Sequence, residues 1–323
     1  MQSKIAVEEH FRIEETKGSE SRYPGPYWSA LSGKLLDVFG VRLAEMDASG
    51  IEMAVLSLNS NAVQGIFDVA RAVEIAHKAN DALAEIVAKR PDRFAALAAL
   101  PMQDPDAAIA ELRRCVRELK FKGVLVNGFS QVGAADTAVY YDLPQYRPFW
   151  AEVERLGVPF YLHPRDPLPS RRQAYEGHPY LVGSPWGFAE ETAIHALKLM
   201  GSGLFDEYPA LKIVLGHLGE RIPYDLWRLD HRLRQVPGRP AKRAMGDYFR
   251  ENFYLTTSGH FSTPSLIQAM LTVGADRLLF AVDYPFEDHA QAAGWFDSAD
   301  IAETDRRKIG RDNAVALFNL GKA

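Results

Sequence analysis

The stretch Ile5-Ala6-Val7-Glu8-Glu9-His10 decides the fold, because a short apolar run leads directly into three ionisable side chains. A doubly wound open sheet would instead follow its first strand with a glycine-rich turn for phosphate. Side chains two residues apart in a strand point the same way, so Glu8 and His10 share one face and Glu9 lies on the other. The stretch therefore favours a barrel strand with a polar end, and an open sheet is the alternative.

Similar apolar runs recur along the chain, and helical patterns lie between them. Eight runs are expected to be strands: Ile5–Val7, Met53–Leu58, Phe94–Ala99, Gly123–Val126, Pro159–Leu162, Lys212–Leu215, Phe253–Thr256 and Leu278–Val282. Their continuous apolar character is typical of strands covered on both faces. About eight strands alternating with helices over ~280 residues predict an α/β fold, a closed (β/α)8 barrel of the TIM type.

No linker rich in Gly, Ser or Pro divides the chain, so we expect one barrel domain over residues 1–323. The segment Arg12–Leu36 lacks a strand pattern and carries aromatic residues, which predicts an aromatic loop insertion at the barrel mouth, with a surface loop that packs its own aromatic residues as the alternative. The segment Arg306–Leu320 is expected to be a closing C-terminal helix. Further helices are expected after Asp104-Pro105, where Pro follows an N-cap residue, and over Val73–Ile86, Pro144–Leu156 and Glu190–Met200.

The composition excludes several classes of protein. The 37 Lys and Arg residues against 42 Asp and Glu give a net charge of −5, and no basic stretch exists to bind nucleic acid. The single cysteine, Cys115, excludes a disulfide framework and a cysteine-based metal site. The longest apolar run, Phe94 to Met102, is too short to span a membrane. We therefore expect a soluble, cytoplasmic protein without nucleic-acid or membrane partners.

The strongest functional signal is the position of ionisable residues at the ends of four predicted strands. Glu8 and His10 end the first strand, His163 the fifth, His217 the sixth and Asp283 the eighth. The C-terminal ends of barrel strands converge on one rim. Buried together, two carboxylates would repel each other, and a divalent cation removes that conflict. The pattern predicts a metal site, with Mn²⁺ and Zn²⁺ as the main candidates and Mg²⁺ as a further one.

Three neighbouring residues extend this site. Glu220 follows His217 by three residues and could hold its imidazole in one tautomer, or simply favour a helix N-terminus. Arg228 lies about two helical turns beyond Glu220, with an ordinary surface ion pair as the alternative. Asn127 ends the fourth strand and offers no bridging ligand, so we expect one metal ion per chain.

The other histidines carry a weaker signal. His178 and His289 fall in predicted loops, and His260, after the seventh strand, is a weaker candidate for the barrel mouth. No usable Gly-x-Ser-x-Gly, Walker or Gly-x-Gly-x-x-Gly motif is present, and Cys115 belongs to an apolar helix stripe, so it is not expected to be a nucleophile. Three histidines lie within helical patterns and are expected to be packed or solvated: His77, His195 and His231.

Seven short motifs are spread over nearly the whole chain: Val7–Phe11, Pro91–Phe94, Leu125–Gln131, Tyr140–Pro144, Val158–Arg165, Leu215–Glu220 and Asp283–Glu287. Together they resemble the amidohydrolase superfamily, in particular its decarboxylating branch with the γ-resorcylate and 2,3-dihydroxybenzoate decarboxylases. The Glu-x-His opening is discriminating, because hydrolytic relatives usually have His-x-His there. Asn127–Gln131 resembles the γ-resorcylate enzymes, whereas Ser258–Thr263 resembles the 2,3-dihydroxybenzoate enzymes.

This resemblance implies roles for individual residues. Glu8, His10, His163 and Asp283 would be the ligands of a single divalent metal. His217 and Glu220 would form a supporting dyad, with Arg228 behind it. The members of this branch form homotetramers in which neighbouring chains help to close the pocket, so a homotetramer or homodimer is expected. The pocket for an aromatic acid would be lined or covered by Tyr23, Asn127, Phe188 and Phe286.

The implied reaction is the reversible, non-oxidative decarboxylation of an ortho-hydroxybenzoate such as 2,6-dihydroxybenzoate, 2,3-dihydroxybenzoate or salicylate. We expect Asp283 to protonate the ring carbon that bears the carboxylate, and burial beside Glu8 to keep that carboxyl protonated. One alternative is a metal-dependent hydrolase of a lactone or cyclic amide, in which Asp283 takes a proton from water. The other is a barrel that binds an aromatic acid without catalysis.

Overall fold

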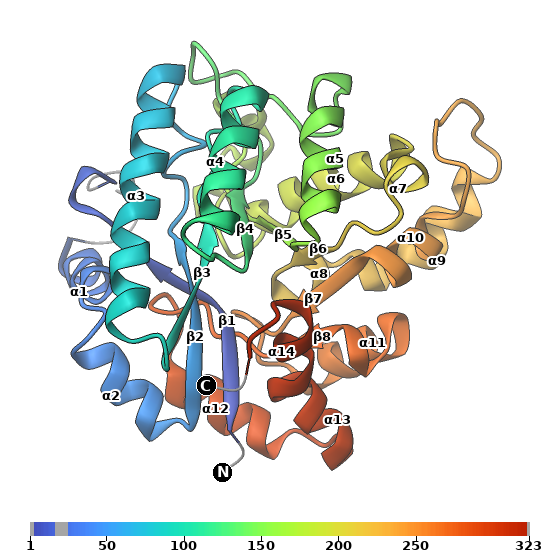
Figure 1. Ribbon diagram of the computed structural model, residues 1–323. Coiled ribbons are helices and arrows are strands. Elements are labelled where there is room, and N and C mark those ends of the chain that lie inside the picture. The colour runs from blue at the N-terminus through green and yellow to red at the C-terminus, as the bar shows by residue number, and fades with distance from the viewer. Residues whose placement is uncertain (1–2, 17–24, 322–323) are drawn as a thin grey trace.

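The computed structural model describes residues 3–16 and 25–321. Its eight strands form one parallel sheet in sequence order (Figure 1), which confirms the barrel expected from the sequence. Parallel neighbours require crossover connections, and helices lie between most successive strands. The strands are β1 (Lys4–Phe11), β2 (Ile51–Leu58), β3 (Phe94–Ala98), β4 (Gly123–Asn127), β5 (Phe160–His163), β6 (Ile213–Leu215), β7 (Phe253–Thr256) and β8 (Leu278–Leu279).

Backbone hydrogen bonds close the sheet between β1 and the residues that follow β8. The amide of Asp283 donates to the carbonyl of Glu8 at 3.0 Å, and the amide of His10 donates to the carbonyl of Tyr284 at 2.8 Å. The regular part of β8 ends at Leu279, so the expected strand Leu278–Val282 was too long. The first strand is longer than the expected Ile5–Val7, because β1 continues through its ionisable residues to Phe11.

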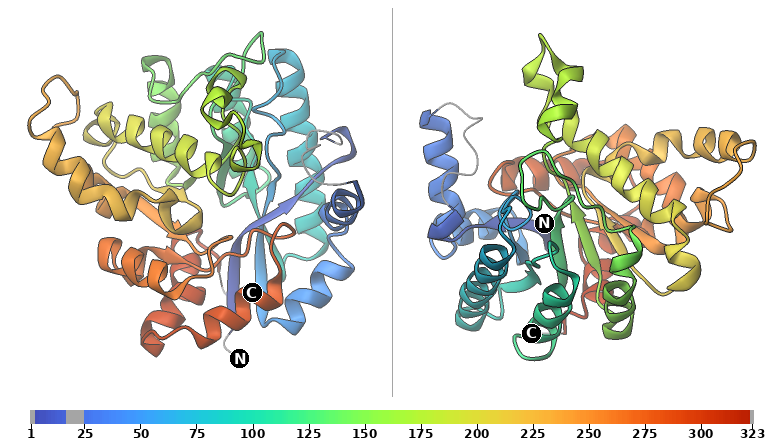
Figure 2. Two further views of the ribbon diagram at one scale, coloured as in Figure 1. Left: turned by 180° about the vertical axis from the view of Figure 1, so that it is seen from behind. Right: turned by 90° about the horizontal axis from the view of Figure 1, so that it is seen from above.

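Helices surround the sheet, as the two further views show (Figure 2). No helix of the described residues is long and apolar enough to cross a membrane. The α-helices are α1 (Gly25–Leu36), α2 (Val41–Ala48), α3 (Val69–Lys89), α4 (Pro105–Arg117), α5 (Arg147–Leu156), α6 (Gly187–Gly201), α7 (Leu204–Glu207), α8 (His217–Glu220), α9 (Ile222–Leu233), α10 (Met245–Asn252), α11 (Thr263–Val273), α12 (His289–Ser298), α13 (Glu303–Arg307) and α14 (Asn313–Leu317). Shorter helical turns are η1 (Glu14–Thr16), η2 (Pro144–Tyr146), η3 (Pro169–Tyr175), η4 (Pro179–Leu181), η5 (Ala275–Arg277) and the π-helical η6 (Lys308–Asp312).

Two apolar cores hold the barrel together. The larger one lies between the strands and the surrounding helices and buries Trp150 and Phe149 of α5 completely. The smaller one fills the barrel interior, where Phe318 and Leu320 of the C-terminal segment pack against strand residues such as Ile5. The C-terminal residues therefore close the end of the barrel at which β1 begins. Functional side chains are left to the opposite end, at the C-terminal ends of the strands.

Two segments differ from their expected form. The segment Arg12–Leu36 contains the helix α1, which buries Leu31 and Leu35 one turn apart. The expectation of an aromatic loop was therefore wrong for that part. The segment Arg306–Leu320 differs less: it is helical as expected, but the helix runs from Glu303 to Leu317 and its middle turn, η6, is π-helical.

Gly123 begins β4 at a position where a side chain does not fit. A Cβ atom there would lie 2.8 Å from the carbonyl oxygen of Pro159 and 3.0 Å from a methyl group of Leu97. Gly123→Ala is expected to lower the free energy of unfolding by about 1–3 kcal/mol, because the barrel backbone has little freedom to move away. Gly294→Ala is the matched control, since the same methyl group meets open space in α12. Urea unfolding of both variants tests this, and a Gly123→Ala protein as stable as the control would contradict it.

Candidate metal centre

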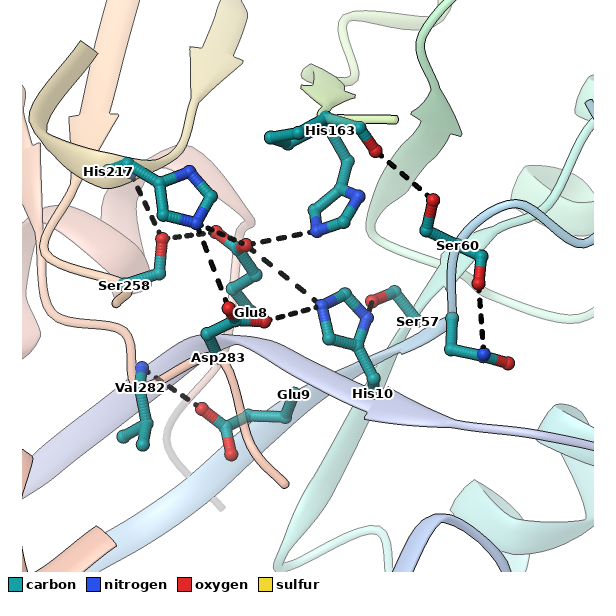
Figure 3. Close-up of polar contacts among 12 residues, drawn as sticks. Glu8, Glu9, His10, Ser57, Ser60, His163, His217, Ser258, Val282 and Asp283 are labelled. Carbon is teal, nitrogen blue, oxygen red and sulfur yellow. Dashed lines mark hydrogen bonds and ion pairs between the residues drawn. The ribbon is translucent and has the colours of Figure 1, made fainter. Parts of the chain in front are cut away.

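The four side chains predicted as metal ligands meet at the C-terminal end of the barrel (Figure 3). Glu8 and His10 come from β1, His163 ends β5 and Asp283 follows β8. One ligand atom from each residue lies within 4.8 Å of all the others. Glu8 Oε1 is 3.2 Å from His163 Nε2, and His10 Nε2 is 3.1 Å from Asp283 Oδ1. Two carboxylates and two imidazoles so arranged form a donor set for one divalent cation.

The unpaired atoms of this cluster fit a metal ion. Glu8 Oε1 and His10 Nε2 are buried and have no partner with hydrogen-bond geometry among the described residues. The other polar atom of each side chain is already held: Ser57 Oγ lies 3.1 Å from His10 Nδ1, and the hydroxyls of Tyr161 and Ser258 donate to Glu8 Oε2. Buried polar atoms without partners are costly, and a cation between these two atoms would satisfy both.

Both carboxylates of the cluster are ionised. Burial alone would raise the pKa of Glu8, but the surrounding imidazoles of His217, His163 and His10 hold it well below its ordinary value. Burial and Glu8 also raise the pKa of Asp283, yet the imidazoles of His10 and His217 lower it further, so the net shift is downward. The expectation that burial beside Glu8 keeps Asp283 protonated was therefore wrong. Two adjacent ionised carboxylates strengthen the case for a cation.

The predicted dyad lies beside these ligands. His217 Nδ1 is 2.7 Å from Glu220 Oε1, and His217 Nε2 is 3.7 Å from Asp283 Oδ2. Burial alone would lower the pKa of His217, but Glu220 and Glu8 raise it well above its ordinary value. The imidazole is therefore fixed through one nitrogen, while its other nitrogen faces the ligand cluster.

Three residues of the site take left-handed backbone conformations that side chains other than glycine rarely adopt. The φ angles are 51° at His217, 52° at Glu220 and 78° at Asp283. Each such conformation costs about 1–3 kcal/mol. The amide of His217 donates to Ser258 Oγ at 3.2 Å, and the amide of Asp283 donates to the carbonyl of Glu8 at 3.0 Å. The surrounding structure thus holds the strained residues in place.

Two of the predicted pocket residues lie next to the ligands. Asn127 pairs in register with His163 at the end of β4, and its buried Oδ1 has no hydrogen-bond partner among the described residues. The ring of Phe286 lies 5.9 Å from that of His10 in an edge-on arrangement. Phe188 lies in the first turn of α6 and is partly exposed. Polar and aromatic groups therefore stand beside the cluster, as an aromatic acid would require.

Arg228 lies on the exposed side of α9. It borders a groove between α6 and α9 that Glu220 also lines, but no hydrogen bond or ion pair joins the two within the described part of the chain. Asp230, two positions beyond Arg228, accepts from the amides of Met245 and Gly246 at the start of α10. Tyr23, the remaining predicted residue, lies outside the described residues.

Sequence reasoning missed the residues that support the ligands. Tyr161 precedes His163 by two positions on β5, and Ser258 follows Thr256 by two positions at the end of β7. The two-residue period of a strand could have placed Tyr161 on the ligand-bearing face. Ser57 gave no such signal, since a serine within an apolar run is common and its partner His10 is remote in sequence.

Glu9 points away from the cluster, as its place between Glu8 and His10 predicts. Its carboxylate lies 2.8 Å from Nε2 of His289. His289 is the buried first residue of α12, so its expected position in a loop was wrong. The ring of His289 stacks on Tyr284, with 4.3 Å between centroids.

The remaining histidines contact groups away from the four ligands. His195 is buried against Tyr140 and Tyr141, as expected of a packed residue. Nδ1 of His260 lies 3.3 Å from the backbone carbonyl oxygen of His217. Cys115 is buried in α4, where burial raises the pKa of its thiol, which agrees with its exclusion as a nucleophile. The other three have these partners: His77 with Glu111, His178 with Tyr180, and His231 with Trp227.

Comparisons with known proteins agree with this geometry. Residues 39–320 match the model of the family described as amidohydrolase. The chain is 60% identical, over the full length of both proteins, to the γ-resorcylate decarboxylase of Rhizobium sp. (strain MTP-10005). A crystal structure of 2,6-dihydroxybenzoate decarboxylase complexed with 2,6-dihydroxybenzoate has a TM-score of 0.97 and 60% identity, and the match covers 99% of this chain and 100% of that one.

A further structure bears on the metal. The dihydroxybenzoic acid decarboxylase from Polaromonas sp. JS666, with bound manganese and the inhibitor 2-nitroresorcinol, has a TM-score of 0.97 and 56% identity to this chain. The match covers 100% of this chain and 98% of that one. Manganese in so similar a structure agrees with a donor set of two carboxylates and two imidazoles.

We expect the chelator-treated protein to take up one Mn²⁺ per chain, and His163→Ala to reduce this to a small fraction. The reason is that His163 supplies one of four clustered donors, whereas His260 lies outside the cluster. His260→Ala is therefore the matched control and should bind as the unaltered chain does. Elemental analysis after gel filtration measures the metal content. Equal metal loss in both variants would contradict the assigned ligand set.

Proposed function

Because the chain belongs to the amidohydrolase family, we propose that it is a metal-dependent carboxy-lyase of that superfamily. Its substrate is 2,6-dihydroxybenzoate, which it converts reversibly to resorcinol and CO₂. The observation that carries this proposal is the cluster of Glu8, His10, His163 and Asp283 at the barrel mouth. Full-length identity of 60% to a γ-resorcylate decarboxylase supports the choice of substrate.

The chemistry of the substrate explains why such a site is needed. Loss of CO₂ directly from a benzoate would leave an electron pair on a ring carbon with no acceptor. Protonation of that carbon first gives a dearomatised β-keto acid, because an ortho hydroxyl can become the carbonyl. The carbon–carbon bond then breaks, and its electron pair restores the aromatic ring. A divalent metal supplies Lewis-acid stabilisation of the charge on the substrate's carboxylate and ortho oxygen.

In this proposal Asp283, ionised at rest, takes a proton from the imidazole of His217, whose raised pKa keeps it protonated, and delivers that proton to the ring carbon. Its two oxygens face different groups, since Oδ1 lies 3.1 Å from His10 Nε2 and Oδ2 lies 3.7 Å from His217 Nε2. One carboxyl group can thus remain among the ligands and still exchange a proton with His217. Glu220 holds the His217 ring from behind through the 2.7 Å contact with Nδ1. When the reaction runs toward carboxylation, the proton leaves the ring carbon for Asp283 and passes from there to His217.

The remaining predicted residues shape the pocket. Asn127 presents its unpartnered amide oxygen beside His163, where it can accept a hydrogen bond from a ring hydroxyl. Phe286 and Phe188 offer aromatic faces to the substrate ring. Together these groups would exclude water while the ring is dearomatised.

We expect metal-dependent CO₂ release from 2,6-dihydroxybenzoate, faster than from 2,3-dihydroxybenzoate or salicylate. The test uses protein stripped of metal and reloaded with Mn²⁺, Zn²⁺ or Mg²⁺, with chromatography of the phenol produced. Asp283→Asn is expected to lower turnover by about 10²–10⁴-fold, the usual contribution of a general acid. Its metal content is measured alongside, so that loss of the ion is distinguished from loss of the proton donor.

Two results would overturn parts of this proposal. Undiminished turnover by metal-loaded Asp283→Asn would remove Asp283 as the proton donor. Metal bound at one ion per chain, without CO₂ from any of the three acids but with opening of a lactone or cyclic amide, would indicate a hydrolase instead.

We further propose that the chain forms a homotetramer or homodimer. On α9, Tyr224 is 83% exposed and Trp227 is 73% exposed. Beside them lies a groove of about 540 Å³ between α6 and α9, with Leu197 and Leu229 among its lining residues. Large exposed aromatic side chains next to an apolar groove are typical of protein–protein interfaces. A second copy on this face would also cover Arg228, which shares the groove.

Trp227→Glu is expected to shift the assembly toward smaller species, because a buried interface aromatic commonly contributes about 2 kcal/mol or more to association. Leu143→Glu is the control, since Leu143 is also an exposed apolar residue but lies outside the groove. Sedimentation velocity measures the outcome. An unchanged assembly in Trp227→Glu would exclude this face as the interface, and a monomeric unaltered chain would exclude the assembly.

A cytoplasmic location is also proposed. The one cysteine of the chain is a buried free thiol, which is usual for proteins of reducing compartments.

A further inference from the structure

The second oxygen of Glu8 is surrounded by three hydroxyl groups, which we call the hydroxyl cluster: Tyr161, Thr256 and Ser258. Ser258 Oγ lies 2.5 Å and Thr256 Oγ1 lies 3.3 Å from Glu8 Oε2, and the Tyr161 hydroxyl donates to the same atom. All four side chains are fully buried. The first oxygen, Oε1, has no hydrogen-bond partner among the described residues and faces the other ligands. The two oxygens of one carboxylate therefore have different surroundings.

Bonds within the hydroxyl cluster set the direction of its protons. Thr256 Oγ1 lies 2.9 Å from the Tyr161 hydroxyl and 2.8 Å from Ser258 Oγ. Ser258 Oγ also accepts from the amide of His217 at 3.2 Å, which leaves its own proton for Glu8. The Tyr161 hydroxyl donates to Glu8 Oε2 as well. Two hydroxyl protons therefore point at Glu8 Oε2.

Gly216 leaves the space that this arrangement needs. A Cβ atom at Gly216 would lie 3.0 Å from Glu8 Oε2, 3.2 Å from Ser258 Oγ and 3.4 Å from the Tyr161 hydroxyl. The backbone of Gly216, with φ of −69° and ψ of −179°, is open to any residue. The glycine is thus required by the close approach of the hydroxyl cluster and Glu8. The close approach at Gly216 is therefore a second observation of the hydroxyl cluster, separate from its hydrogen bonds.

We propose that Tyr161 is a positioning residue that, together with Ser258 and Thr256, makes Glu8 a metal ligand through Oε1 alone. The inference rests on the metal site of the proposed function and adds the group that orients its central carboxylate. A Glu8 carboxylate held in this way cannot rotate both oxygens toward the metal.

The test measures Mn²⁺ affinity of the full-length, chelator-treated chain by the electron paramagnetic resonance signal of free Mn²⁺. Tyr161→Phe and Ser258→Ala are each expected to raise the dissociation constant by about 10- to 100-fold, as is usual for groups that hold a metal ligand. One ion per chain should still bind at saturation, because all four ligands remain.

The chain offers a matched pair of controls. Ser130 and Tyr141 are also buried, and their hydroxyls lie 2.9 Å apart, away from Glu8. Tyr141→Phe and Ser130→Ala therefore remove the same groups from an equivalent buried contact. Both should bind Mn²⁺ as the unaltered chain does. Thermal unfolding of the metal-free proteins separates a loss of stability from a loss of metal affinity.

The outcomes distinguish this inference from the proposed function. If the unaltered chain binds no Mn²⁺, the metal site itself fails. If it binds one ion and both Tyr161→Phe and Ser258→Ala bind with unchanged affinity, the positioning role is overturned. Should Tyr161→Phe fail to fold, Ser258→Ala against Ser130→Ala decides the question. Gly216→Ala should also weaken binding, since its methyl group displaces Glu8 Oε2.

Discussion

The buried carboxylate of Glu8 is held between hydroxyl groups on one oxygen and imidazole rings on the other, and the rest of the site is arranged around it. Moving an ionised carboxylate from water into a low-dielectric interior costs on the order of 20 kcal/mol before compensation. The hydroxyls of Tyr161 on β5 and of Ser258, just after β7, compensate Oε2. His163, at 3.2 Å, and a bound cation would compensate Oε1. These compensating groups come from different strands, so the negative charge of Glu8 is stabilised at the place where those strands converge.

Closure of the barrel and spacing of the ligands depend on the same backbone bonds. The amide of Asp283 donates to the carbonyl of Glu8, and the amide of His10 donates to the carbonyl of Tyr284. The buried guanidinium of Arg42 adds a bond to the carbonyl of His10 and lies 4.7 Å from the ring of Tyr284. Joining β1 to the residues after β8 therefore brings the two carboxylates together and supports the left-handed backbone of Asp283. The same backbone bonds therefore determine both the closure of the fold and the geometry of the site.

The ligand positions could be predicted because they follow apolar runs in the sequence. His163 and Asp283 come directly after such runs, and the strands of a barrel end on a common rim. The protonation of Asp283 could not be predicted in the same way. Burial and Glu8 raise the pKa of Asp283, whereas the imidazoles of His10 and His217 lower it. The net shift depends on the distances from Asp283 to these groups, which the sequence does not give. The hydroxyl cluster was missed because serine, threonine and tyrosine in strands are usually structural.

The sequence by itself determined the barrel, the ligand positions that follow its apolar runs and the faces of β1. These are local properties, because apolar runs and a two-residue period are set by neighbouring residues. Only the tertiary structure decided that Oε1 of Glu8 faces the metal site, that Asp283 is ionised and that Glu9 pairs with His289. Each of these depends on distances between segments remote in sequence, 280 positions apart in the last case. Local sequence patterns contain no such distances, because remote segments come close together only when the barrel closes.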